Sequence, residues 1–307
     1  MKRSSLWWRA LQITIACATA SFLAHRVITN VREIRGFAWD VQPWKLGASL
    51  VLHVAVLVFG AVVWSRVLAR FDTSPIPVRT LLRIWSTSTF ARYIPGTVWQ
   101  FVVGARMASR YAVDPLLLLS SISVHMGMSL AGAAIVAVSL LPLHARVPWW
   151  LVTLAPLPIL VVHPAVVDGA RKLLARVTRR ELPRWGGTWT DGIGLLALNV
   201  LGWLAYGCAF WMLLAALSDM PLSKLPATVG IHALVFVAGY AAFFMPAGLG
   251  VREAALALLL GPHFPGGVAV ALAAFTRLWT IAAELGTALI SLTLLRPSRV
   301  VDDAGEG

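Results

Sequence analysis

Two arginines and two glutamates stand in or beside apolar runs near the C-terminal end of the sequence. Arg252 and Glu253 are adjacent, and Arg277 lies inside the apolar run 267–295. Glu284 follows Arg277 by seven positions, close to two helical turns, so both would share one helix face. A guanidinium group forms paired, charge-assisted hydrogen bonds with phosphate or carboxylate. The pattern predicts either a site for an anion or ion pairs that hold helices together, and the residues alone leave both open.

The position of Arg252 and Glu253 adds a second pair of alternatives. Both follow the glycines Gly248 and Gly250 and would lie in the first turn of a helix. The N–H groups of a first turn attract negative charge. Glu253 could be the anion that they bind, or Arg252 and the N–H groups together could bind the phosphate of a ligand.

The elements that position these residues are predicted from composition to be membrane helices. Of the 307 residues, 59% are hydrophobic and 13% are charged, and the mean hydropathy is +0.78. A soluble domain has about 25% charged residues, and a transmembrane helix needs roughly 20 apolar residues. We therefore predict an all-α, polytopic transmembrane bundle over 1–300, followed by a disordered tail over 301–307.

The apolar runs give the predicted spans. A first helix covers Leu11–Ala24, although its Ala18-Thr19-Ala20 also fits a signal-peptide cleavage site. Spans are expected at 46–68, 116–143, 149–167, 192–217, 225–245 and 267–295, with a short arm at 254–260.

Basic residues assign sides to the loops. The net charge is +13, and the basic residues stand between apolar runs, which argues against nucleic-acid binding. Cytoplasmic loops are enriched in Lys and Arg, so the loops 66–92 and 168–191 should be cytoplasmic, as should both termini. The loops 142–148 and 218–225 should then be outside, together with the more basic 28–45. The chain is thus expected in the cytoplasmic membrane as a multi-pass protein.

Proline and glycine interrupt two apolar stretches. Pro95 and Gly96 divide the stretch 80–110 into two arms that are each too short to span. Pro246 begins a second, glycine-rich break before a short arm. We predict two broken hairpins that enter the membrane from opposite faces, although each could also be a simple kink.

Each predicted hairpin is followed by one long span, which suggests an inverted repeat of 46–143 and 192–295. Paired interrupted segments at matching positions mark transporter sites near the middle of the membrane.

Three stretches resemble one protein family. Arg92-Tyr-Ile-Pro-Gly-Thr-Val-Trp99 and Pro246-Ala-Gly-Leu-Gly-Val-Arg-Glu-Ala254 look like the two signature stretches of the lysylphosphatidylglycerol synthase transmembrane-region family, also called the flippase-like domain family. Arg277-Leu-Trp-Thr-Ile-Ala-Ala-Glu284 is similar to its final helix. Ala247 departs from the family, where a second glycine is more usual. The resemblance implies the lipid-translocating half of such enzymes without the soluble aminoacyltransferase domain.

We therefore expect a transporter or flippase that binds an anionic lipid, either a phospholipid or a polyprenyl-phosphate-linked lipid. The candidate substrate-binding residues are Arg92, Pro95, Gly96, Pro246, Gly248, Gly250, Arg252, Glu253, Arg277 and Glu284.

Two other functions remain open from the sequence. One is a membrane-embedded glycosyl- or phospho-transferase with a polyprenyl-phosphate donor, for which Glu33 and Asp40 are the candidate acids. The other is a non-catalytic assembly partner. No catalytic motif, cofactor motif or metal-ligand spacing is present in the sequence, and His53, His125 and His232 are expected to be hydrogen-bonding helix residues.

Overall fold

The computed structural model describes Thr14, Ser21 and residues 25–71, 76–91, 99–111, 113–141, 149–242 and 250–294. Within these ranges the elements are helical, and the only strand-like pairing is an isolated bridge between Phe71 and Trp185. The prediction of an all-α protein is confirmed. In order, the elements are α2 (Val31–Gly36), α3 (Pro43–Leu68), α4 (Val78–Ala91), α5 (Trp99–Arg110), α6 (Pro115–Leu140), η2 (Trp149–Leu154), η3 (Leu157–Val162), α7 (Pro164–Thr178), α8 (Trp189–Ala215), η4 (Leu222–Lys224), α9 (Leu225–Ala241), α10 (Val251–Leu260), α11 (Gly266–Leu289) and η6 (Ile290–Leu294).

Among the residues that the structure describes, five helices are each long and apolar enough to cross a membrane. They are Pro43–Leu68, Pro115–Leu140, Trp189–Ala215, Leu222–Ala241 and Gly266–Thr293. Each coincides with a span predicted from the sequence, and the chain is a multi-pass helical membrane protein. The predicted first helix falls mainly outside the described residues, and the predicted tail lies wholly outside them.

The predicted span over 149–167 is part of a bent helix pair and not one continuous α-helix. The 3-10 stretches η2 and η3 occupy most of it, and the segment Val152–Val162 meets Pro164–Arg176 at 62°. Pro156, Pro158 and Pro164 explain the difference, because proline lacks the N–H group that an α-helix needs.

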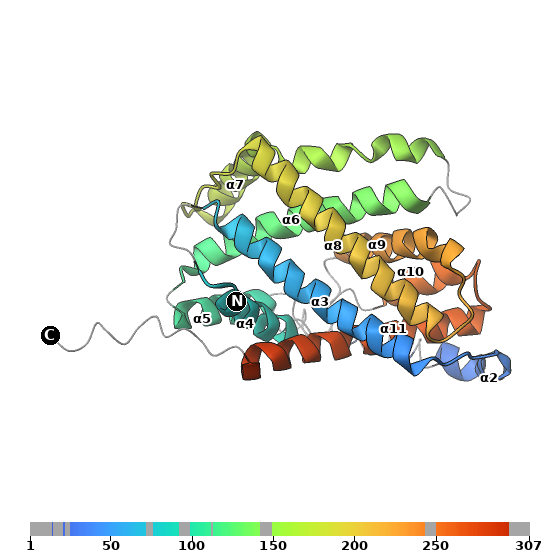
Figure 1. Ribbon diagram of the computed structural model, residues 1–307. Helices are drawn as coiled ribbons and strands as arrows, with labels where there is room; N and C mark the ends of the chain where they lie inside the picture. Colours follow the sequence, from blue (N-terminus) through green and yellow to red (C-terminus); the bar gives the residue numbers. More distant parts are fainter. Residues whose placement is uncertain are drawn as a thin grey trace.

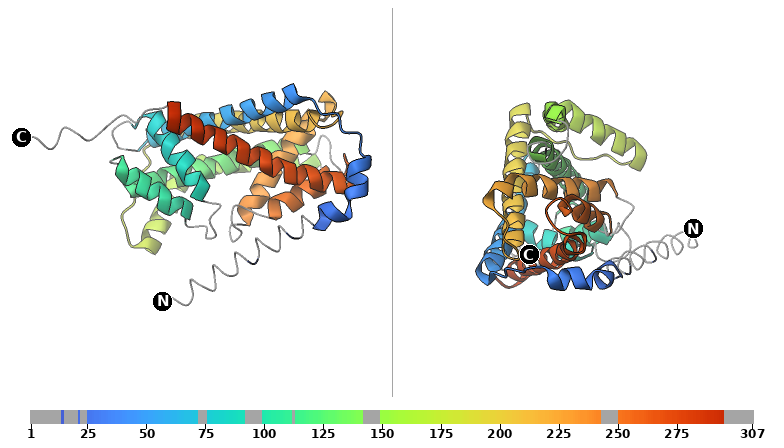
Figure 2. Two further views of the ribbon diagram at one scale, coloured as in Figure 1. Left: turned by 90° about the horizontal axis from the view of Figure 1, so that it is seen from below. Right: turned by 90° about the vertical axis from the view of Figure 1, so that its right-hand side faces the viewer.

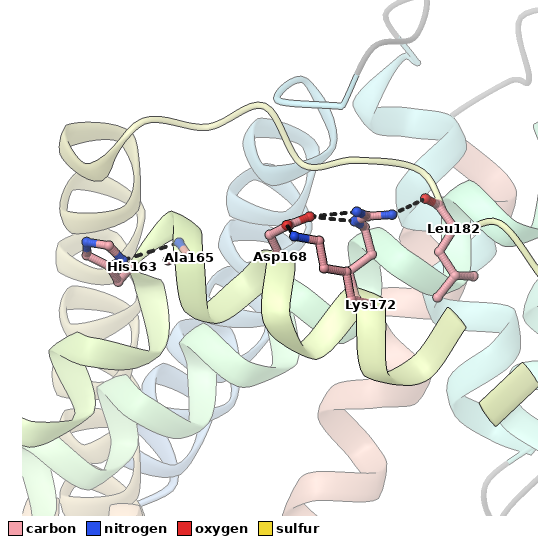
Figure 3. A network of polar contacts seen from close by, with 6 residues as sticks. His163, Ala165, Asp168, Lys172 and Leu182 are labelled. Atoms are coloured by element: carbon pink, nitrogen blue, oxygen red, sulfur yellow. Dashed lines mark hydrogen bonds and ion pairs between the residues drawn. The ribbon is translucent and has the colours of Figure 1, made fainter. Parts of the chain in front are cut away.

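The helix α7 begins at this bend. The Nδ1 atom of His163 accepts a hydrogen bond from the Ala165 N–H at 3.2 Å, which caps the helix. Asp168 then forms ion pairs of 2.7 Å and 2.8 Å with Arg171 and Lys172, and these contacts follow one side of α7 (Figure 3). Part of the predicted basic loop 168–191 is therefore an ordered helix.

Contacts between loops define one end of the bundle, here called the α7 end. Phe71 pairs with Trp185, and the Gly186 N–H donates to the Arg70 carbonyl at 2.7 Å. Arg70 also forms an ion pair of 2.7 Å with Asp191. These contacts join two loops that the sequence placed on the same side of the membrane.

The opposite end of the bundle, the α2 end, is also fixed by polar contacts. The Gln42 N–H donates to the Ala216 carbonyl at 2.8 Å, where α8 ends. The carboxylate of Glu33 accepts from the Gly267 N–H at 2.7 Å, where α11 begins. Figure 1 shows α2 and α7 at opposite ends of the long helices.

The elements α11 and η6 connect the α2 end of the bundle with α4. Beginning beside α2, this segment reaches α4, where Arg83 donates to the carbonyl groups of Ser291 and Leu292 at 2.9 Å each. A guanidinium group at a helix C-terminus satisfies carbonyl groups that have no partner within the helix.

Three of the helices that are too short to span the membrane occur in two pairs of packed helices. In the first pair, α4 packs on α5, and in the second, α9 packs on α10. With 14, 12 and 10 residues, α4, α5 and α10 are each shorter than a span. The outer ends of α4 and α5 lie toward the α7 end, whereas α9 starts and α10 finishes toward the α2 end (Figures 1 and 2). The two pairs therefore open in opposite directions.

Small residues let the central helices approach closely. A Cβ atom added at Gly132 of α6 would lie 3.2 Å from the Cβ of Asn199 on α8. Close backbone contact of this kind favours helix association in lipid. The side chain of Asn199 donates within its own helix to the Leu195 carbonyl at 2.8 Å.

Candidate functional site

A partly open cavity of about 50 Å³ lies among α8, α9, α10 and α11. Two arginines and a glutamate contribute all the formal charge of its described wall. The other polar groups come from hydroxyl, phenol and imidazole side chains, and the remainder of the wall is apolar. The lining residues are Tyr206, His232, Val235, Phe236, Arg252, Glu253, Leu256, Ala273, Thr276, Arg277 and Thr280.

The first turn of α10 positions Glu253 at this cavity. Gly250 precedes the helix with φ of 86°, a backbone conformation that favours glycine. The Gly250 N–H donates to Oε2 of Glu253 at 2.7 Å. The carboxylate of Glu253 therefore lies at the N-terminus of α10, where a negative charge is stabilised.

The other carboxylate oxygen of Glu253 faces α11. Its Oε1 lies 3.8 Å from Nη1 of Arg277, and the two side chains are 4% and 14% exposed. This distance is longer than a hydrogen bond, so the attraction between the groups is mainly Coulombic. The expected ion pair of Arg277 is thus present between helices, with Glu253 as a partner.

Arg252 points to the same cavity across the surface of α9. The carbon of its guanidinium group lies 4.9 Å from the ring centre of Phe236, which is a cation–π contact. Gly239 lies on the same face of α9, and a Cβ added there would overlap Cγ, Cδ and Nε of Arg252. Gly239 therefore leaves the space in which the arginine stem lies.

An aromatic cluster extends behind the cavity. The ring centres of Tyr206 and His232 are 4.3 Å apart, and those of Phe210 and His232 are 4.7 Å apart. His53 of α3 continues the cluster, with centre distances of 4.5 Å to Tyr206 and 4.1 Å to Trp279. Rings from four helices thus hold the wall of the cavity in place.

Sequence reasoning missed Phe236, Gly239 and Tyr206 as parts of the site. No motif marks them, because each acquires its role only when α8, α9, α10 and α11 pack together. The period of α9 does place Phe236 and Gly239 on one face, three positions apart, but many such pairs occur in apolar helices.

The remaining predicted residues fall into two groups. Glu284 is 5% exposed on α11 and is not part of the described cavity wall. Arg92, Pro95, Gly96, Pro246 and Gly248 lie outside the described residues.

The structure gives the acids of the transferase alternative other contacts. Glu33 caps α11 at Gly267, and Asp40 accepts a hydrogen bond from Gln42. Among the residues that the structure describes, no group of three or more His, Cys, Asp or Glu side chains could hold a metal ion.

Comparisons with protein-family models, with curated proteins and with solved structures find no match to this chain.

Proposed function

We propose that this membrane protein is flippase-like, and that it binds the anionic head of a phospholipid or polyprenyl-phosphate-linked lipid and moves it across the cytoplasmic membrane. The observation that carries the proposal is the meeting of Arg252, Glu253 and Arg277 at one cavity among apolar helices. A central arginine costs about 2.5–3.5 kcal/mol on insertion into a membrane helix. Two such residues at one cavity favour a ligand that uses their charge.

The charge of the cavity suits a singly charged phosphate group. Two arginines and one glutamate give the described wall an excess of one positive formal charge. A phosphodiester carries one negative charge and would neutralise this excess. Two guanidinium groups also offer the paired donors that match phosphate oxygens.

The wall of the cavity also suits a lipid. Phe236, Val235, Leu256 and Ala273 provide apolar surface beside the charged groups. A headgroup could therefore contact the arginines while its glycerol or prenyl portion remains in an apolar environment. Such an arrangement avoids the cost of placing a charged head directly among lipid tails.

The two oppositely opening helix pairs support the same proposal. We interpret α4–α5 and α9–α10 as the arms of broken, re-entrant hairpins in an inverted repeat of 46–143 and 192–295. Repeats of this kind place substrates near the middle of the membrane and alternate access between the two sides. The resemblance to the flippase-like domain family implies the same type of activity.

Translocation by purified protein is the direct test. The protein is reconstituted into vesicles that contain a fluorescent phosphatidylglycerol, and a membrane-impermeant reductant reports the fraction that has moved between leaflets. We expect Arg252→Lys and Arg277→Lys each to slow movement about tenfold, because lysine loses the bidentate geometry. Arg176→Lys, on the exposed surface of α7, is the matched control and should move lipid normally. Equal rates for all four proteins would reject the arginine cavity as the lipid path.

A further inference from the structure

One imidazole nitrogen of His232, a residue of the cavity wall, has no role in the site as described so far. His232 of α9 lines the cavity and is 8% exposed. Its Nδ1 atom is buried and makes no hydrogen bond with the described part of the chain. A buried polar atom without a partner is unfavourable in proteins, so a ligand that supplied the partner would bind more tightly.

The neighbours of His232 hold the ring without satisfying this nitrogen. Phe210 stacks on it with an interplanar angle of 22°, and Tyr206 meets it edge to face at 73°. These contacts fix the plane of the imidazole in the cavity wall. A half-turn about the Cβ–Cγ bond exchanges Nδ1 with Cδ2 within that plane, so the ring can present nitrogen on either edge.

We propose that His232 binds a hydroxyl group of the lipid head, next to the phosphate that Arg252 and Arg277 hold. This inference rests on the proposed function. A hydroxyl both donates and accepts, so it pairs with Nδ1 in either neutral tautomer of the ring.

Other common headgroups fit this position less well. A primary ammonium group would be repelled by the two guanidinium groups that share the cavity, and the carboxylate of Glu253 in the same wall already contacts Arg277 and the Gly250 N–H. A trimethylammonium group has no N–H hydrogen to donate to the ring. The geometry thus selects a hydroxylated phosphodiester over a zwitterionic one.

Two short-chain lipids of equal charge test the inference. Dihexanoyl phosphatidylglycerol carries two hydroxyl groups on its head, and dihexanoyl phosphatidylmethanol carries none. Calorimetric titration of the detergent-solubilised full chain measures both dissociation constants. We expect the wild type to bind the glycerol lipid roughly fivefold more tightly, which is the effect of one net hydrogen bond.

The variants isolate the imidazole. His232→Phe keeps the ring packing and should bind both lipids equally, whereas His232→Gln retains a hydrogen-bonding side chain and should keep part of the preference. His125→Phe is the control, because His125 is also a buried histidine with an unbonded Nδ1 among the described residues but does not line the cavity. It should behave as the wild type.

The outcomes separate this inference from the proposed function. If Arg277→Gln abolishes binding of both lipids while the wild type shows no preference between them, the role of His232 is overturned and the anion site remains. An unchanged preference in His232→Phe also overturns it. If the wild type binds neither lipid, both the proposed anion site and the role of His232 are rejected.

Discussion

Replacing Gly239 by alanine should disturb Arg252 although residue 239 is not itself in the cavity wall. The new Cβ would overlap Cγ, Cδ and Nε of Arg252. These atoms lie in the middle of the side chain, so a small movement of its tip cannot relieve the overlap. The guanidinium group would have to leave its position 4.9 Å from the Phe236 ring.

The size of the effect follows from three terms. Forcing a methyl group into a packed site costs about 1–3 kcal/mol. Loss of a desolvated cation–π contact costs up to about 2 kcal/mol, and the better helix propensity of alanine returns up to about 1 kcal/mol. The first two terms overlap, since moving Arg252 relieves the clash. We expect a net destabilisation of about 1–3 kcal/mol and a loss of lipid transport similar to that of Arg252→Ala.

A double-mutant cycle gives the decisive measurement. Thermal unfolding in detergent and lipid movement in vesicles are compared for Gly239→Ala, Arg252→Ala and the double variant. Because Arg252→Ala removes the overlapping atoms, the double variant should be no worse than Arg252→Ala alone. Gly60→Ala is the control, since a Cβ on that α3 glycine meets nothing within 4 Å. Strict additivity, or a Gly239→Ala variant as active as Gly60→Ala, would refute the reasoning.

Three further predictions concern two charged side chains and the sides of the membrane on which two loops lie. Glu253→Gln should destabilise the protein less than Glu253→Ala, because glutamine loses the ion pair but can still accept from the Gly250 N–H. Equal melting temperatures of the two variants would contradict this prediction. Arg83→Lys should destabilise by about 1–3 kcal/mol, because lysine cannot bond two carbonyl groups of η6 in parallel. Chemical denaturation that matches the wild type would contradict this role of Arg83. An impermeant thiol reagent applied to whole cells should label a cysteine at Asp219 and spare one at Arg180, and the reverse pattern would reverse the assigned sides.

The membrane fold follows from the sequence because its physical requirement is simple. A span needs a long apolar run, and the runs that begin near 46, 116, 192, 225 and 267 are long enough. The run at 149–167 is also apolar, yet it is part of two segments that meet at 62° and not one continuous helix. Hydropathy records how apolar a segment is, whereas Pro156, Pro158 and Pro164 determine which backbone hydrogen bonds it can make.

The candidate site was only partly predictable. Arg252, Glu253 and Arg277 stand out in the sequence because charged residues are costly in apolar runs. Their pairing did not follow from spacing, since spacing within one helix favoured Glu284 for Arg277. The contact with Glu253 depends on how α10 packs against α11, and a single sequence carries no direct signal of that packing.

The two contacts of Glu253 suggest how ligand binding and helix position are connected in the proposed transporter. One carboxylate oxygen accepts from Gly250 at 2.7 Å, and the other faces Arg277 at 3.8 Å. An incoming phosphate would compete for Arg277 only, because the amide of Gly250 is held by the shorter and better aligned contact. The cap of α10 would then persist while its attraction to α11 weakens. Binding of the anion would thus loosen one helix contact at the cavity without unravelling the helix that presents Arg252.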